Sequence, residues 1–125
     1  MCEVKTKRWD DPIERGDGTR VLVTRYRPRG LPKADETWTE WVPAIAPSAA
    51  LHAAAYGKTG LKIAWDAYRA SYLREMRLQS ATIDALAARI RAGETLTLLC
   101  SSQCDRESRC HRSLLKSLID RATQA

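Results

Sequence analysis

Apolar side chains recur at helical spacing in three parts of the chain, which predicts three amphipathic helices. The first begins at Ile63, and its apolar face consists of Trp65, Tyr68, Tyr72 and Met76. The second has Ser80 as its N-cap and Gly93 as its stop, and its inward positions are Ile83, Leu86 and Ile90. The third runs from near Ser108 to about Ala122, with the buried stripe Leu114, Leu115, Leu118 and Ile119.

Shorter apolar runs between turn signals predict three strands. Two of them, Val4–Trp9 and Arg20–Arg25, are separated by a turn at Asp17-Gly18. The third, Glu94–Cys100, is apolar almost without interruption toward its end and should therefore be central in the sheet. A strand followed by a loop and an amphipathic helix is half of an α/β unit.

The segment between these elements predicts two short helical pieces. Trp38 and Trp41 lie three residues apart in Thr37–Val42, which is typical of a helical turn closed by a proline. Pro47 and Ser48 then open a helix that extends to Tyr56, with Ser48 as its N-cap. Together the elements predict a small single-domain α/β protein over residues 1–125. We expect three α/β/α layers, a short, partly parallel sheet and a C-terminal amphipathic helix.

Length and charge narrow the classes of function. A chain of 125 residues is sufficient for one domain with a real core, and no apolar run is long enough for a membrane span or a secretory signal. We therefore expect a cytosolic protein that does not enter membranes. The 21 basic residues exceed the 15 acidic ones by six, and 15 of the 21 are Arg. Because the planar Arg fork grips phosphate and carboxylate groups, an anionic partner is expected.

Two basic segments follow predicted strands and could form one anion site. In open α/β sheets, ligands bind beyond the carboxyl ends of the strands, where helix N-termini present N–H groups and partial positive charge. Arg25 and Arg29 follow one strand, and His111 and Arg112 follow another. If the two strands are parallel, the segments emerge at the same edge. The alternative is that each cation is solvated or pairs with a nearby carboxylate.

The cysteines concentrate near the second segment, within the run from Cys100 to Arg112. Cys110, at the start of a helix beside cations, meets the conditions that lower a thiol pKa, so it is a candidate nucleophile. Cys100 to Arg106 also spells C-x5-R, the pattern of Cys-dependent phosphatase loops, but the loop lacks glycine and no separate general acid is apparent.

Two other interpretations of the cysteines remain open. A zinc site could use C-x3-C-x5-C-H, although the spacing is unusual and Cys110 and His111 diverge on a helix. A Cys100–Cys104 or Cys104–Cys110 disulfide is disfavoured in a reducing cytosol except as a redox switch. We assign no metal and no cofactor.

The chain resembles the domain of unknown function 488 family over nearly its whole length. The resemblance lies in Asp17-Gly18-Thr19-Arg20-Val21-Leu22-Val23-Thr24-Arg25-Tyr26-Arg27-Pro28-Arg29-Gly30 and in Cys110-His111-Arg112-Ser113-Leu114-Leu115. The first run is similar to the signature of the YeaO-like branch, with Thr24 and Arg27 in place of its Asp and Trp. The family implies an α/β/α layered fold but no established reaction. On the positions that match, it implies as site-forming residues Arg20, Arg25, Arg29, Cys100, Cys110, His111 and Arg112.

The sequence thus favours a site that binds a phosphate-bearing small molecule or nucleic acid. Arg20, Arg25, Arg29 and Arg112 are the predicted ligand-binding residues. If there is a reaction, His111 is the predicted proton carrier, and Cys110 or Cys100 is the predicted nucleophile. Two alternatives stay open, a basic nucleic-acid-binding or regulatory module without chemistry and a Cys-based metal or redox site.

Overall fold

The computed structural model describes residues 3–57, 60, 62–101 and 110–124. Its centre is a four-stranded sheet in the order β1-β4-β2-β3, in which every pairing is parallel. The strands are β1 Val4–Arg8, β2 Thr19–Leu22, β3 Glu40–Trp41 and β4 Leu96–Cys100. The apolar run at the end of β4 is buried at all five positions between two neighbours, so the predicted central strand is confirmed.

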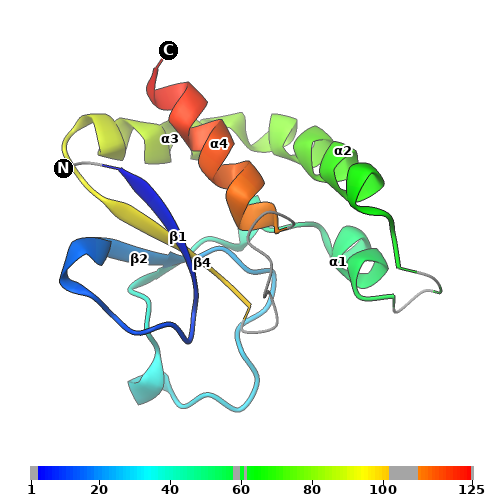
Figure 1. Cartoon of the computed structure of the whole chain (residues 1–125), viewed down its shortest axis with the longest axis horizontal. Helices are drawn as coiled ribbons and strands as arrows, with labels where there is room; N and C mark the ends of the chain where they lie inside the picture. The colour runs from blue at the N-terminus through cyan, green and yellow to red at the C-terminus, as the bar shows by residue number, and fades with distance from the viewer. Residues whose placement is uncertain (1–2, 58–59, 61, 102–109, 125) are drawn as a thin grey trace.

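Four α-helices accompany the sheet in the described residues: α1 Ala49–Ala55, α2 Trp65–Met76, α3 Ser80–Arg91 and α4 His111–Thr123. Figure 1 shows α2, α3 and α4 gathered on one side of the sheet. Short 3-10 turns occur at Arg15–Asp17, Lys33–Asp35, Pro43–Ile45 and Arg77–Gln79. The α/β class predicted from the sequence is confirmed.

The two faces of the sheet are covered differently. On the helical face, the strand residues Val4, Val21, Val23, Leu96 and Leu98 join one apolar cluster with residues of all four helices. On the other face, the described part of the chain covers Leu22 and Leu99 with Trp9, Leu31 and Trp38, none of which belongs to an α-helix. The third layer is therefore a loop, visible in Figure 1 on the side of the sheet away from α4.

Helix ends explain one confirmed and one wrong prediction. Ser48 is the N-cap of α1, where its hydroxyl accepts a hydrogen bond from the Leu51 amide at 3.2 Å. Ser80, in contrast, is the first residue inside α3, and Gln79 occupies the cap position without a side-chain hydrogen bond. A cap was predicted at Ser80 because the sequence does not reveal that the 3-10 turn Arg77–Gln79 carries the chain directly from α2 into α3.

The helical turn predicted over Thr37–Val42 is also wrong. Glu40 and Trp41 form the edge strand β3, which pairs with Val21 and Leu22 of β2. The Thr39 and Val42 amides donate to carbonyls of β2 on either side of this pairing. A spacing of three between two Trp residues also fits a loop and edge strand, and only the long-range pairing distinguishes them. None of the helices in the described part of the chain has the length and apolarity to cross a membrane.

Candidate functional site at the carboxyl edge of the sheet

The carboxyl ends of the two central strands meet the start of α4. His111, the first residue of α4, contacts the Val23 carbonyl through Nε2 at 2.7 Å. Val23 directly follows β2, and Cys100 is the last residue of β4. The parallel pairing of β2 and β4 therefore brings together the two segments that the sequence analysis placed at one edge.

Two buried thiols lie at this edge. The Sγ atoms of Cys100 and Cys110 are 3.1 Å apart, although ten residues separate them in the chain. Cys100 is 1% exposed and Cys110 is 4% exposed, so both thiols are buried. Cys110 has extended backbone angles and is the N-cap of α4, one position before the first helical turn in which the sequence predicted it.

Hydrogen bonding determines which ring nitrogen of His111 can act as a base. A carbonyl only accepts hydrogen bonds, so Nε2 donates to Val23, and the neutral ring has its lone pair on Nδ1. Nδ1 lies 3.9 Å from the Cys110 Sγ. The ring is buried and packs edge to face against Tyr72, with the ring centroids 5.7 Å apart. This packing holds the imidazole beside the Cys110 thiol.

Tyr72 and Arg25 connect the site to the segment before α1. The fully buried Tyr72 hydroxyl donates to the Ile45 carbonyl at 2.8 Å, and Arg25 Nε donates to the Pro47 carbonyl at 2.9 Å. Burial, followed by the proximity of Tyr68, Cys110 and Glu75, raises the pKa of Tyr72 well above 10. Tyr72 was predicted as a core residue, and it is one, but its contact with His111 also makes it part of the site.

Arg112 follows His111 in the chain and is a buried cation. Its side chain is 94% buried, since the residue is only 6% exposed. Its Nε has no hydrogen-bond partner among the residues that the structure describes. A buried polar group left without a partner costs about 1–3 kcal/mol, and a charged one costs more. Arg112 thus carries one buried N–H group, at Nε, that the described protein groups do not satisfy.

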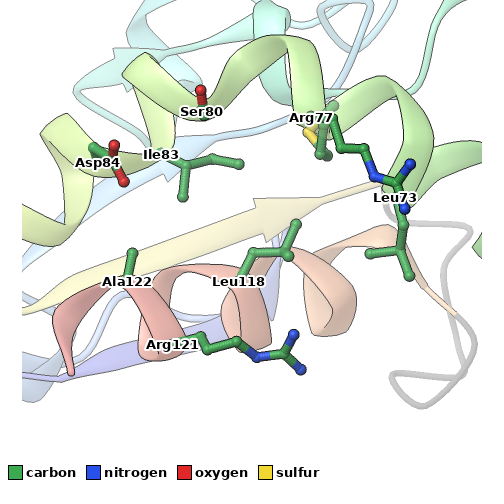
Figure 2. A pocket seen from close by; sticks show the side chains of 9 residues that line it. Leu73, Arg77, Ser80, Ile83, Asp84, Leu118, Arg121 and Ala122 are labelled. Carbon is green, nitrogen blue, oxygen red and sulfur yellow. The ribbon is translucent and has the colours of Figure 1, made fainter. Parts of the chain in front are cut away.

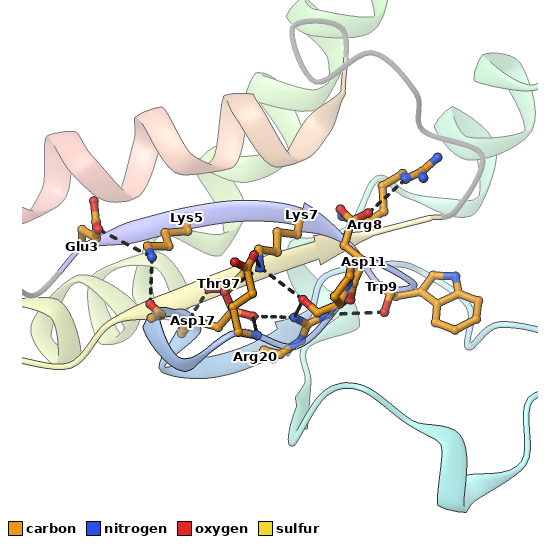
Figure 3. A network of polar contacts seen from close by, with 12 residues as sticks. Glu3, Lys5, Lys7, Arg8, Trp9, Asp11, Asp17, Arg20 and Thr97 are labelled. Atoms are coloured by element: carbon orange, nitrogen blue, oxygen red, sulfur yellow. Dashed lines mark hydrogen bonds and ion pairs between the residues drawn. The ribbon is translucent and has the colours of Figure 1, made fainter.

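Arg20, which the sequence grouped with these residues, lies on the other face of the sheet. Val21 and Val23 face the helices, so Arg20 and Leu22 face away from them. Figure 3 shows the Arg20 guanidinium enclosed by the segment after β1, where it donates to the Asp17 carboxylate at 2.6 Å and to the Asp11 carbonyl at 2.9 Å. These contacts give Arg20 a structural role. Because side chains alternate between the two faces along β2, the sequence could have indicated that Arg20 faces away from the site.

The remaining basic residues differ in their surroundings. Arg29 is exposed, whereas Arg27 pairs with Glu36 at 2.7 Å and lies over the Trp38 ring. Of the predicted positions, Cys104 and Arg106 lie outside the described residues. The described ranges contain no group of three or more His, Cys, Asp or Glu side chains that could hold a metal ion.

A separate groove of about 450 Å³ lies between α2, α3 and α4. Figure 2 shows Leu73, Ile83 and Leu118 lining it, with the side chains of Arg77 and Arg121 beside them. None of the predicted site residues lines this groove.

The fold and site define a small parallel α/β protein in which Cys100, Cys110 and His111 lie together at the carboxyl edge of the sheet, with the buried Arg112 next in the chain. A family model described as the active DUF488-N3 subclade matches residues 4–123. The chain therefore belongs to the domain of unknown function 488 family, as its sequence resemblance indicated. It is 36% identical over 100 residues to the "Uncharacterized protein YeaO" of Escherichia coli strain K12. The matched region covers 80% of this chain and 84% of that protein. No solved structure matches the chain significantly.

Proposed function

We propose that the protein binds a phosphate-bearing small molecule at the carboxyl-edge site, which we define as Cys100, Cys110, His111 and Arg112. The buried Arg112, with its unpartnered Nε, is the observation that carries this proposal. A phosphate group accepts two hydrogen bonds from one guanidinium, so a bound phosphate would compensate the cost of burying this cation. The ligand, in this account, supplies the negative charge that the described protein groups do not.

The start of α4 supports the same ligand chemistry. A helix of 13 residues carries a partial positive charge at its N-terminus, and the Cys110 side chain does not cap this end. Arg25 and Arg29 follow Val23, to which His111 is hydrogen-bonded. Arg25 donates to the Pro47 and Ala46 carbonyls and Arg29 is exposed, so the proposed anion contact depends on Arg112 and the start of α4.

Other arginines are already neutralised, which favours a compact ligand over a long nucleic acid. Arg89 forms a bidentate pair with Glu40 and also binds Glu94, and Arg27 pairs with Glu36. These pairs reduce the number of unpaired arginines that the surface offers to a polyanion. The alternative nucleic-acid-binding module predicts affinity that falls steeply with salt and depends on exposed arginines more than on Arg112.

The Cys110–His111 pair gives the proposed site a means of catalysis. His111 Nδ1 is placed to take the Cys110 proton, and the resulting thiolate is stabilised by the start of α4. On a phosphate ester, the thiolate would attack phosphorus, and the imidazolium would return the proton to the leaving alcohol. Water would then hydrolyse the P–S bond of the phosphocysteine, which releases phosphate and restores Cys110. A cytosolic location, where thiols stay reduced, suits this use of a cysteine thiol.

Binding is tested by titrating the protein with inorganic phosphate and with nucleoside mono- and triphosphates in a calorimeter. Loss of the charge-assisted bonds should weaken binding about 10- to 100-fold in Arg112→Gln. Arg77→Gln removes an exposed Arg beside the helical groove and should leave the affinity unchanged. Equal weakening in both variants, or affinity that depends only on salt and net charge, would contradict the proposal.

Catalysis is tested separately with a chromogenic phosphate monoester. Cys110→Ser and His111→Ala should each abolish turnover while phosphate binding and the melting temperature are retained. Turnover that survives in Cys110→Ser would remove the thiol from the reaction, and the binding proposal would then stand on Arg112 alone.

A further inference from the structure

The sulfur atoms of Cys100 and Cys110 lie closer together than packing in a shared hydrophobic core alone requires. Their Sγ atoms are 3.1 Å apart, about 1 Å more than the length of a disulfide bond. Cys100 ends the rigid central strand β4, and Cys110 caps α4, whose His111 is hydrogen-bonded to Val23. The fold thus holds the two sulfurs near bonding distance from opposite sides of the strand-to-helix connection.

The surroundings of the two thiols are unequal. Cys110 has the His111 Nδ1 lone pair at 3.9 Å and lies at the N-terminus of α4, so it is the thiol with a base beside it. The other neighbours of Cys100 that the structure gives include the Ser101 carbonyl at 3.7 Å, which accepts a hydrogen bond and supplies no base. Cys110 is also the more exposed of the two, at 4% against 1%.

We propose that Cys110 and Cys100 form a redox couple that reduces a small hydroperoxide, with Cys110 as the attacking thiol and Cys100 as the resolving thiol. This activity does not depend on the phosphate-bearing ligand proposed above. Because both sulfurs are buried, the oxidant that we propose is a small hydroperoxide. The sequence analysis left open a redox site with a Cys100–Cys104 or Cys104–Cys110 disulfide, and this proposal pairs Cys100 with Cys110 instead.

The chemistry balances in two steps. The Cys110 thiolate attacks the terminal peroxide oxygen, the O–O bond breaks, and Cys110 becomes a sulfenic acid while the other oxygen leaves as an alcohol or as water. The His111 imidazole accepts the Cys110 proton and returns it to the leaving oxygen. The Cys100 sulfur then attacks the Cys110 sulfur, and the sulfenic oxygen leaves as water with the Cys100 proton. A dithiol reductant restores both thiols by exchange.

The couple is tested on the full chain with hydrogen peroxide. The Cys104→Ser protein lacks the alternative disulfide partner of Cys100 and Cys110. Each chain should consume one equivalent of hydrogen peroxide, and the intact mass should fall by two hydrogens. Tryptic peptides should then show Cys100 linked to Cys110. A dithiol reductant should reverse the change. Peroxide consumption without this link, or a link in wild-type protein only through Cys104, would overturn the proposal.

Two variants separate the roles of the thiols and do not require a phosphate ligand. Cys100→Ser should stop at a sulfenic acid on Cys110, which a cyclic diketone traps, whereas Cys110→Ser should give no trapped product at Cys100. His111→Gln should slow sulfenic acid formation at least tenfold. Cys2→Ser is the matched control and should react like the wild type. A trapped product at Cys100, or an unchanged rate in His111→Gln, would contradict these roles.

Discussion

A single buried carboxylate organises the face of the sheet opposite the site. Asp17 is 1% exposed, and its two oxygens lie 2.6 Å from Arg20 and 2.8 Å from Lys7. Figure 3 shows this network joining β1 and β2 through the 3-10 turn Arg15–Asp17. Burial alone raises the pKa of Asp17, but hydrogen bonds from Lys7, the Glu14 amide and Arg20 outweigh it and lower the pKa from 3.8 to about 2.

Substitution of Asp17 tests its role as the buried counter-charge of Arg20 and Lys7. Asp17→Asn leaves Arg20 buried without its counter-charge, which should cost about 3–5 kcal/mol of unfolding free energy. Urea denaturation at neutral pH measures the loss. Asp10→Asn is the matched control, because Asp10 is exposed and its contact with Arg8 is 3.7 Å long; it should change stability by less than about 0.5 kcal/mol. Equal effects in the two variants would contradict the assigned role of the buried pair.

At the scale of elements, the turn into β2 depends on one glycine. Gly18 has a φ of 63°, and a Cβ placed there would lie 2.2 Å from the Thr95 carbonyl oxygen. The Thr19 amide also donates to this oxygen at 2.9 Å, so the turn sets the start of the β2–β4 pairing. The backbone cannot move away from Thr95 without loss of that hydrogen bond.

Gly18→Ala should therefore destabilise the protein by about 2–4 kcal/mol, because the left-handed backbone and the close contact act together. Gly30→Ala is the matched control, with a φ of 70° and open space around the added Cβ. It should cost only about 1–2 kcal/mol. Thermal melting of the two variants in parallel gives the comparison, and an equal loss would show that the contact with Thr95 contributes nothing.

Elements with a local signal could be predicted from the sequence. The stripe of α2, the cap of α1 and the apolar β4 each depend on neighbours within a few residues. The edge strand β3 could not be predicted, because two residues form it only through pairing with β2. For the candidate site, the parallel topology predicted that the segments after β2 and β4 emerge at one edge of the sheet. Arg20 could be excluded from the site only by comparing the alternation of side chains along β2 with the residues that form the core.

The whole molecule should lose stability in acid. Asp17 and Glu94 both have a pKa of about 2 in the folded protein, Glu94 because of hydrogen bonds from Arg89 and Thr19, with burial opposing them. A lowered folded pKa contributes stability above the unfolded value, and that stability is lost as the pH falls from about 4.5 to about 2. The urea concentration at the unfolding midpoint, measured from pH 7 to pH 2.5, should decline in this window. The midpoint of the Asp17→Asn variant should decline less. A midpoint that is flat below pH 4 would contradict these ion pairs.

The central claim concerns the counter-charge of Arg112 and is tested most directly by crystallography. Crystals grown without phosphate and soaked with tungstate, a heavy oxyanion of phosphate-like charge and shape, would locate the anion by its anomalous signal. We expect density within hydrogen-bond distance of the Arg112 guanidinium at the start of α4. An Arg112 guanidinium paired with a carboxylate of the chain itself, such as Asp105 or Glu107, with no anion beside it, would contradict the account.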